Sequence, residues 1–282
     1  MKKSAILLML SLSLNLNAQT TSNFVDALIE DVNQRMEVCK EKQNELMALV
    51  RGKEMTSELR AKGDSIYQVY MSMFEAITND IKSTIEGHLD DAATSKLLLT
   101  FKRQLGYDYL EAIMHKYKFA ASDELAGLRD ELVIEATKKP GAQLVDFELP
   151  DETGINHRLS EYVGQGHFVL VDFWASWCGP CRAEMPYVLK AYERFHKKGF
   201  DILGLSFDNN RDAWLKAIAE LGMSWPQLSD LQGWKSLAAQ RYGVHAIPFT
   251  ILFDPTGKVV ATNLRGDALA SKLEELMIVG EK

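Results

Sequence analysis

Two cysteines separated by two residues carry the clearest chemical signal in the sequence. They are Cys178 and Cys181, in the stretch WASWCGPCR at residues 174–182. Residues three apart lie on one face of a helical turn, so the two sulfurs can reach each other as a disulfide. A helix N-terminus stabilises a thiolate, which is the nucleophile of disulfide exchange. We therefore predict that Cys178 has an exposed sulfur and reacts first, and that the more buried Cys181 reacts second.

The two residues between the cysteines fit the start of a helix. Pro180 suits the first turn, where no backbone N–H is needed. Gly179 is expected to let the chain turn tightly at this point.

Strand and helix patterns alternate around the pair, from residue 140 to residue 282. Apolar runs predict buried strands, and apolar residues three or four apart predict helices. This order is typical of an α/β fold with a mixed sheet and helices on both faces. Strands are expected at 167–175, 200–207, 249–254 and 258–264, and helices at 184–198, 212–222, 233–243 and 267–278.

The preceding segment, residues 19–139, has a helical pattern, and residues 24–139 contain no proline. Apolar residues recur at helical spacing, which predicts four or five helices packed as an all-α bundle, with a break near Gly106. Cys39 lies on the first apolar stripe, so we expect it to be buried; a redox or intermolecular role is the alternative. Pro140 and Gly141 stop the helical pattern, which places the domain boundary at residue 140.

The first residues resemble a secretory signal peptide. Lys2 and Lys3 precede an apolar run over 5–16, and Ala18 follows. The run is too short to span a bilayer. We predict a signal peptide at 1–18 and a protein that is soluble in the periplasm or another exported compartment, where disulfides persist.

Bulk composition excludes some classes of function. The formal net charge is −7, from 32 basic and 39 acidic residues, which argues against nucleic-acid binding through phosphate neutralisation. Three cysteines do not make a framework of structural disulfides. No cofactor is indicated.

The segment VDFWASWCGPCRAEMP closely resembles the active-site segment of thioredoxins, and the domain resembles the exported TlpA/ResA-like thiol–disulfide oxidoreductases. The resemblance covers about residues 141–282, roughly half of the chain, and includes Pro186 and the later stretch AIPFTILFDPTGKVV. It implies a thioredoxin-like fold in which Pro248, after Ile247, is cis and faces the cysteines. Backbone groups there would bind an extended substrate segment.

The resemblance also implies roles for two acids and two tryptophans. Asp172 matches a buried acid whose pKa is raised by desolvation and which exchanges a proton with Cys181. Glu184 matches an acid typical of the TlpA/ResA-like group. The alternatives are a tolerated polar strand residue for Asp172 and a solvated helix face for Glu184. Trp174 is expected to pack in the core, and Trp177 to shape the docking surface.

The sequence departs from thioredoxin at two positions. The strand DILGLSF lacks the lysine that pairs with the buried acid in thioredoxins, which puts the proton route in doubt. Phe249 stands where a threonine commonly follows the cis proline.

Cys178 and Cys181 could also belong to a site other than a redox site. A zinc site needs four ligands, and the sequence has no second cysteine pair; the nearby histidines are His196, expected on a solvated helix, and His245. A copper-delivery protein would use both thiolates and a downstream histidine such as His245, usually with a three-residue spacer. A peroxidase signature is absent. A further alternative is a binding protein in which the helical domain binds the partner and the thiols only assist.

The Gly-Pro spacer favours a direction of electron flow. It is the spacer of thioredoxin, whose potential is about −270 mV, against about −120 mV for the oxidant DsbA. We therefore expect a protein-disulfide reductase, kept reduced by a membrane electron donor and acting on exported client proteins, with cytochrome c maturation as one setting. A disulfide oxidase or isomerase is the alternative. The helical domain has three open roles: client selection, dimerisation and docking near the donor.

Overall fold

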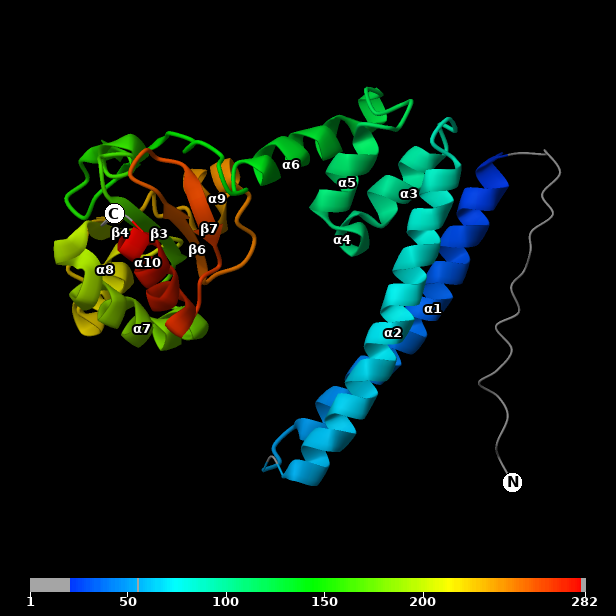
Figure 1. Ribbon diagram of the computed structural model, residues 1–282, viewed down its shortest axis with the longest axis horizontal. Coiled ribbons are helices and arrows are strands. Elements are labelled where there is room, and N and C mark those ends of the chain that lie inside the picture. The colour runs from blue at the N-terminus through cyan, green and yellow to red at the C-terminus, as the bar shows by residue number, and fades with distance from the viewer. Residues whose placement is uncertain (1–20, 55, 280–282) are drawn as a thin grey trace. The chain divides into compact units, whose positions relative to one another are not determined.

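A computed structural model describes residues 21–54 and 56–279. The predicted signal peptide, 1–18, lies outside these residues. The chain divides into two compact units between Leu128 and Arg129 (Figure 1).

The N-terminal unit is all-α, as predicted. Helices α1 (Thr21–Val50) and α2 (Ser57–Gly87) lie side by side as a long antiparallel pair (Figure 1). Thr56 is the N-cap residue of α2, and its hydroxyl accepts a hydrogen bond from the Leu59 N–H at 3.1 Å. In the described part of the chain, no helix has the length and apolar character needed to cross a membrane.

Shorter helices complete this unit: α3 (Thr94–Thr100), α4 (Lys102–Leu105) and α5 (Tyr107–Met114). Gly106 separates α4 from α5 with a φ of +76°, which confirms the predicted break. Cys39 is buried on α1, as expected, and burial raises the pKa of its thiol.

Helix α6 (Ala126–Ala136) crosses the division between the units. Two residues after α6 ends, the Lys138 ammonium donates a hydrogen bond to the Gly243 carbonyl at 3.2 Å. A Cβ added at Gly243 would lie 2.7 Å from the Ile134 side chain. These contacts join residues 129–139 to the second unit, so its compact body starts before the helix stop at Pro140.

The second unit is built on a five-stranded mixed sheet of order β5-β4-β3-β6-β7, which confirms the predicted fold class. The central strand β3 pairs in parallel with β4 and antiparallel with β6. The strands are β3 (Phe168–Trp174), β4 (Phe200–Ser206), β5 (Gln227–Leu228), β6 (Phe249–Phe253) and β7 (Val259–Thr262).

Helices cover both faces of this sheet (Figure 1). On one face, α7 is linked to α8 by Arg182 and Glu220 and to α10 by Arg194 and Glu274. On the other, Tyr242 of α9 packs edge-on against Phe173 of β3, with ring centroids 6.0 Å apart. The helices are α7 (Gly179–Phe195), α8 (Arg211–Leu221), α9 (Leu237–Tyr242) and α10 (Asp267–Val279).

Several short elements differ from the sequence prediction. The helix expected at 233–243 is split, because Ser236 caps α9 after a separate turn, η4 (Gly233–Lys235). Strand β5 and the hairpin of β1 (Glu148–Pro150) and β2 (Asn156–Arg158) were not predicted as such.

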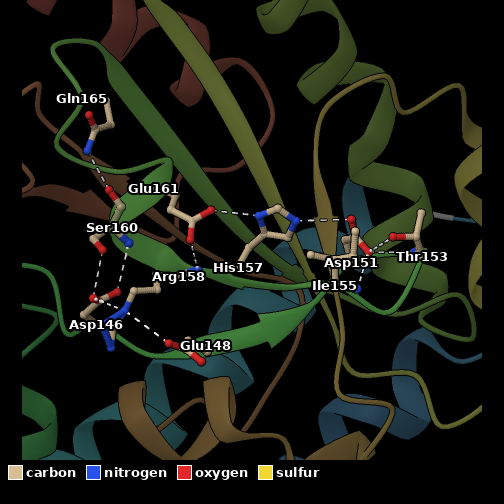
Figure 2. Close-up of polar contacts among 10 residues, drawn as sticks. All are labelled: Asp146, Glu148, Asp151, Thr153, Ile155, His157, Arg158, Ser160, Glu161 and Gln165. Atoms are coloured by element: carbon tan, nitrogen blue, oxygen red, sulfur yellow. Dashed lines mark hydrogen bonds and ion pairs between the residues drawn. The ribbon is translucent and has the colours of Figure 1, made fainter.

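Charged side chains hold the β1–β2 hairpin (Figure 2). His157 lies between two carboxylates, with Nδ1 2.8 Å from Glu161 and Nε2 3.3 Å from Asp151. Asp146 accepts hydrogen bonds from the backbone N–H and the hydroxyl of Ser160. This network holds the hairpin and the start of the segment that leads to β3. Its residues precede β3 in the chain, whereas the cysteines follow it.

Candidate active site

Cys178 and Cys181 form a disulfide at the N-terminus of α7, with their Cα atoms 5.3 Å apart. Cys178 is the N-cap residue, and its sulfur accepts a hydrogen bond from the Cys181 N–H at 3.1 Å. Pro180 occupies the first turn, as predicted. The Cys178 sulfur therefore lies at the helix N-terminus and accepts one of its N–H groups, an environment that stabilises a thiolate when the disulfide is reduced.

Two details of this helix start correct the sequence prediction. Cys178 is only 4% exposed, against 2% for Cys181, so the prediction of an exposed first sulfur is wrong for the disulfide form. The sulfur turns inward because it bonds to Cys181 and accepts that residue's N–H. Gly179 has an ordinary helical backbone and room for a Cβ, so its predicted turning role is also wrong. The turn is made earlier, where the Cys178 N–H donates to the Ala175 carbonyl at 3.1 Å.

Asp208 anchors the loop that leads into the cysteines. This buried carboxylate follows β4 and accepts hydrogen bonds from the N–H of Ser176 at 2.9 Å and from its hydroxyl at 2.5 Å. Ser206 donates to the same carboxylate at 2.7 Å. Asp208 was not predicted as a site residue. The available signal was an acid after β4, at the sheet edge where β3 also ends.

We expect Asp208→Ala to destabilise the second unit by about 2–4 kcal/mol, because it leaves the Ser176 N–H and hydroxyl without their acceptor. Urea unfolding followed by tryptophan fluorescence measures this, since all five tryptophans lie beyond residue 140. Asp212→Ala is the control: Asp212 is exposed in the first turn of α8, and its loss should cost under about 1 kcal/mol. Equal losses in the two variants would contradict the anchoring role.

Asp172 is a buried acid on β3, only 5% exposed. Burial raises the pKa of its carboxyl to about 7; Glu184 adds to the rise and Arg265 opposes it. The predicted upward shift is therefore confirmed. A carboxyl with this pKa can both accept and release a proton near neutral pH.

Glu184 does not lie on a solvated helix face. It is half-buried on α7, and its Oε2 accepts a hydrogen bond from the Gly266 N–H at 2.8 Å. The cation near Asp172 also comes from this region: it is Arg265, in the loop between β7 and α10, and not a residue of β4. Arg265 was not predicted as a site residue, because nothing in the local sequence pattern places that loop beside β3.

The peptide bond between Ile247 and Pro248 is cis, as the resemblance implied. Both residues are half-buried. Strand β6 begins directly after them, and its first residue, Phe249, pairs with Phe173 near the end of β3. The antiparallel register thus brings the cis-proline loop to the sheet edge where the chain leaves β3 toward Cys178. Phe249 packs edge-on against Phe173, with centroids 5.7 Å apart, so this position contributes to the core.

Two exposed tryptophans lie beside the cysteine turn. Trp177 is 53% exposed, and its ring centroid lies 6.1 Å from that of Trp234, which is 48% exposed. Trp234 in turn packs on Phe207 at 5.3 Å. Trp174 is buried and donates to the Gln227 side chain at 3.0 Å, which confirms its packing role. The structure thus adds Trp234 to the apolar surface expected at Trp177.

Among the residues that the structure describes, no group of three His, Cys, Asp or Glu side chains could hold a metal ion. His245 and His196 are both exposed.

This combination of sheet order, disulfide, cis proline and buried acid defines the thioredoxin-like class. The AhpC/TSA family model matches residues 140–262. The thiol-disulfide oxidoreductase ResA of Bacillus thuringiensis subsp. konkukian is 30% identical over 137 residues, which cover 49% of this chain and 76% of the relative. ResA of Geobacillus thermodenitrificans is 36% identical over 119 residues, 42% of this chain and 66% of the relative.

A solved structure is also similar. The thioredoxin domain of a thiol-disulfide oxidoreductase from Bacteroides vulgatus is 37% identical, covers 49% of this chain and 98% of that domain, and has a TM-score of 0.46. The ResA relative of Bacillus thuringiensis is covered over more than two thirds of its length, so through its C-terminal half the chain belongs to the thioredoxin-like thiol–disulfide oxidoreductases of the ResA type.

Proposed function

We propose that the protein is an exported reductase of client protein disulfides. The observation that carries the proposal is the Cys178–Cys181 disulfide at the N-terminus of α7, with the Cys178 sulfur facing the Cys181 N–H. A dithiol in this place gives up two electrons and two protons as it closes to the disulfide, and a client disulfide takes them up as two thiols.

The exchange runs in two steps. The Cys178 thiolate attacks one client sulfur, which breaks the client disulfide and forms a mixed disulfide. The Cys181 thiolate then attacks the Cys178 sulfur, which closes the ring and releases the client thiolate. Asp172 is the group proposed to take the Cys181 proton, since its pKa of about 7 lets it be ionised at neutral pH.

The direction of electron flow is the finer part of the proposal. The Gly-Pro spacer supports a reducing potential, and a reductase needs a donor that restores the dithiol. We propose a membrane electron donor and exported clients, in keeping with the signal-peptide pattern at 1–18. The client disulfides that we propose for this reductase include those of cytochrome c maturation.

We expect a reduction potential of about −270 mV for the Cys178–Cys181 pair. It is measured by equilibrating the protein against dithiothreitol or glutathione and following fluorescence, because Trp177 adjoins Cys178 in the chain. A value of about −120 to −180 mV would contradict the reductase and indicate an oxidase or isomerase on the same site.

A further inference from the structure

The segment Asn263–Gly266, between β7 and α10, contacts both sides of the redox site. Arg265 donates a hydrogen bond from Nη2 to the carbonyl oxygen of Pro248, the residue that follows the cis peptide bond. One residue later, the Gly266 N–H donates to Glu184 at 2.8 Å, and Glu184 lies one turn after Cys181 on α7. The segment therefore links the helix that carries the cysteines to the loop that carries the cis proline.

The backbone holds this segment in place on the sheet. The Asn263 N–H donates to the Thr250 carbonyl at 2.8 Å. Asn263 has a φ of +54°, the left-handed conformation that asparagine tolerates better than most residues, and its side chain accepts from Arg265 at 3.3 Å. Thr250 itself pairs with Asp172 across β6 and β3. Arg265 is thus held by two side-chain hydrogen bonds, to Pro248 and to Asn263, in a segment that is bonded to the strand residue opposite the buried acid.

The charges around Asp172 oppose one another. Arg265 favours the ionised carboxylate, and Glu184 disfavours it. The same two acids act on Arg265, which is partly desolvated. A guanidinium cannot be deprotonated in a protein, so it keeps its charge in such a place. Asp172 therefore has a permanent positive neighbour at every pH at which the site works.

We propose that Arg265 is a positioning residue of the redox site, which fixes the Pro248 carbonyl through an N–H and keeps the Asp172 carboxyl available as a proton acceptor through its charge. The inference deepens the proposed function and rests on it for its catalytic meaning. In the resolving step the Cys181 proton passes to the Asp172 carboxylate. The Cys181–Cys178 bond then forms while the bond from Cys178 to the client sulfur breaks. The client sulfur leaves as a thiolate and takes a proton from water.

The direct test is a carbon-13 NMR titration of the Asp172 carboxyl in the oxidised full-length protein, with Asp172→Asn identifying the signal. The disulfide has no titrating thiol, so the charged groups acting on Asp172 are Arg265 and Glu184. Wild type should titrate near pH 7. Arg265→Gln should raise this midpoint by at least about one pH unit, because the stabilising cation is gone. Arg265→Lys should leave it within a few tenths.

Three further variants make the result specific. Arg265→Met removes the charge but keeps an unbranched side chain, so it should shift the Asp172 midpoint as Arg265→Gln does. It replaces Arg265→Gln in the test if that variant does not fold. Glu184→Gln keeps an acceptor for Gly266 but loses the anion, and should lower the midpoint. Arg241→Gln, at an exposed arginine of α9, should leave it unchanged. An unchanged midpoint in both Arg265→Gln and Arg265→Met would overturn the proposal.

Activity provides the second readout. Reduction of insulin at pH 7 should fall at least about fivefold in Arg265→Gln, recover toward wild type as the pH is raised, and stay near wild type in Arg265→Lys. A loss that is the same at every pH would overturn the charge role. If wild type reduces no disulfide but the Asp172 midpoint moves as expected, the proposed reductase fails and the placement of Arg265 stands. Active wild type with an unmoved midpoint would reject the Arg265 inference alone.

Discussion

Replacing Cys178 with serine is expected to lower disulfide-reducing activity by at least about a thousandfold, the scale of loss when a catalytic nucleophile is removed. A serine hydroxyl stays protonated at neutral pH, so it cannot attack a client disulfide even at the N-terminus of α7. Turnover of insulin with a chemical reductant as the electron source measures the loss. Activity within tenfold of wild type would contradict the role of Cys178 as the attacking thiol.

Cys181→Ser, three residues further along the chain in the first turn of α7, should give a different outcome. The first attack by Cys178 still occurs, but the mixed disulfide cannot be resolved, so the protein accumulates as covalent complexes with clients. These are seen as reducible bands on non-reducing gels of the exported fraction. Cys39→Ala, introduced alone and with each variant, is the matched control, because Cys39 is the remaining thiol and is buried on α1. Complexes that depend on Cys39, or none at all, would refute the two-step exchange.

The sequence was most informative where the signal is local. Apolar runs and helical spacing between residues 140 and 282 predicted the long strands and helices correctly, since burial imposes a period on each element. The buried state of Asp172 was also predictable, because it interrupts the apolar run VLVDFW. The disulfide followed from spacing, and the cis bond at Pro248 followed from the family resemblance.

The sequence was least informative where a contact joins distant segments. Arg265 and Asp208 are ordinary polar residues in their own neighbourhoods, yet each bonds to a segment of the site far away in the chain. Strand β5 has only two residues, too few to show a period. The burial of Cys178 likewise depends on the disulfide itself, which turns the sulfur inward and which a helix-start argument does not describe.

For the helical unit, the sequence predicted the helices but not the function. Its helices were predicted from periodicity, and Cys39 and the break at Gly106 lie as expected. The apolar stripes report on packing within the helices, not on what the unit binds. Its role therefore has to come from experiment, for example from whether a chain lacking 19–139 still forms the same mixed disulfides through Cys178.

Asp172→Asn is expected to stabilise the second unit by up to about 4 kcal/mol at pH 9 and not at pH 4. The unfolded carboxyl loses its proton near its usual value of 3.8, whereas the folded one keeps it until about pH 7. Between these values the folded state binds more protons, so wild-type stability falls as the pH rises. About three pKa units at 1.36 kcal/mol each give the size of the penalty above pH 7. Asparagine is neutral throughout and escapes it.

The pH dependence separates this charge effect from packing. Any cost of the asparagine amide is present at both pH values, so the difference between the gains at pH 9 and pH 4 isolates ionisation. Glu193→Gln, at an exposed acid of α7, should show no such difference. The same Asp172→Asn variant should also resolve mixed disulfides more slowly, because the proton acceptor for Cys181 is lost. If the variant is more stable at pH 9 and resolves mixed disulfides more slowly, the buried Asp172 carboxylate destabilises the fold and at the same time serves proton transfer. A stability gain that is equal at pH 4 and pH 9 would contradict the raised pKa.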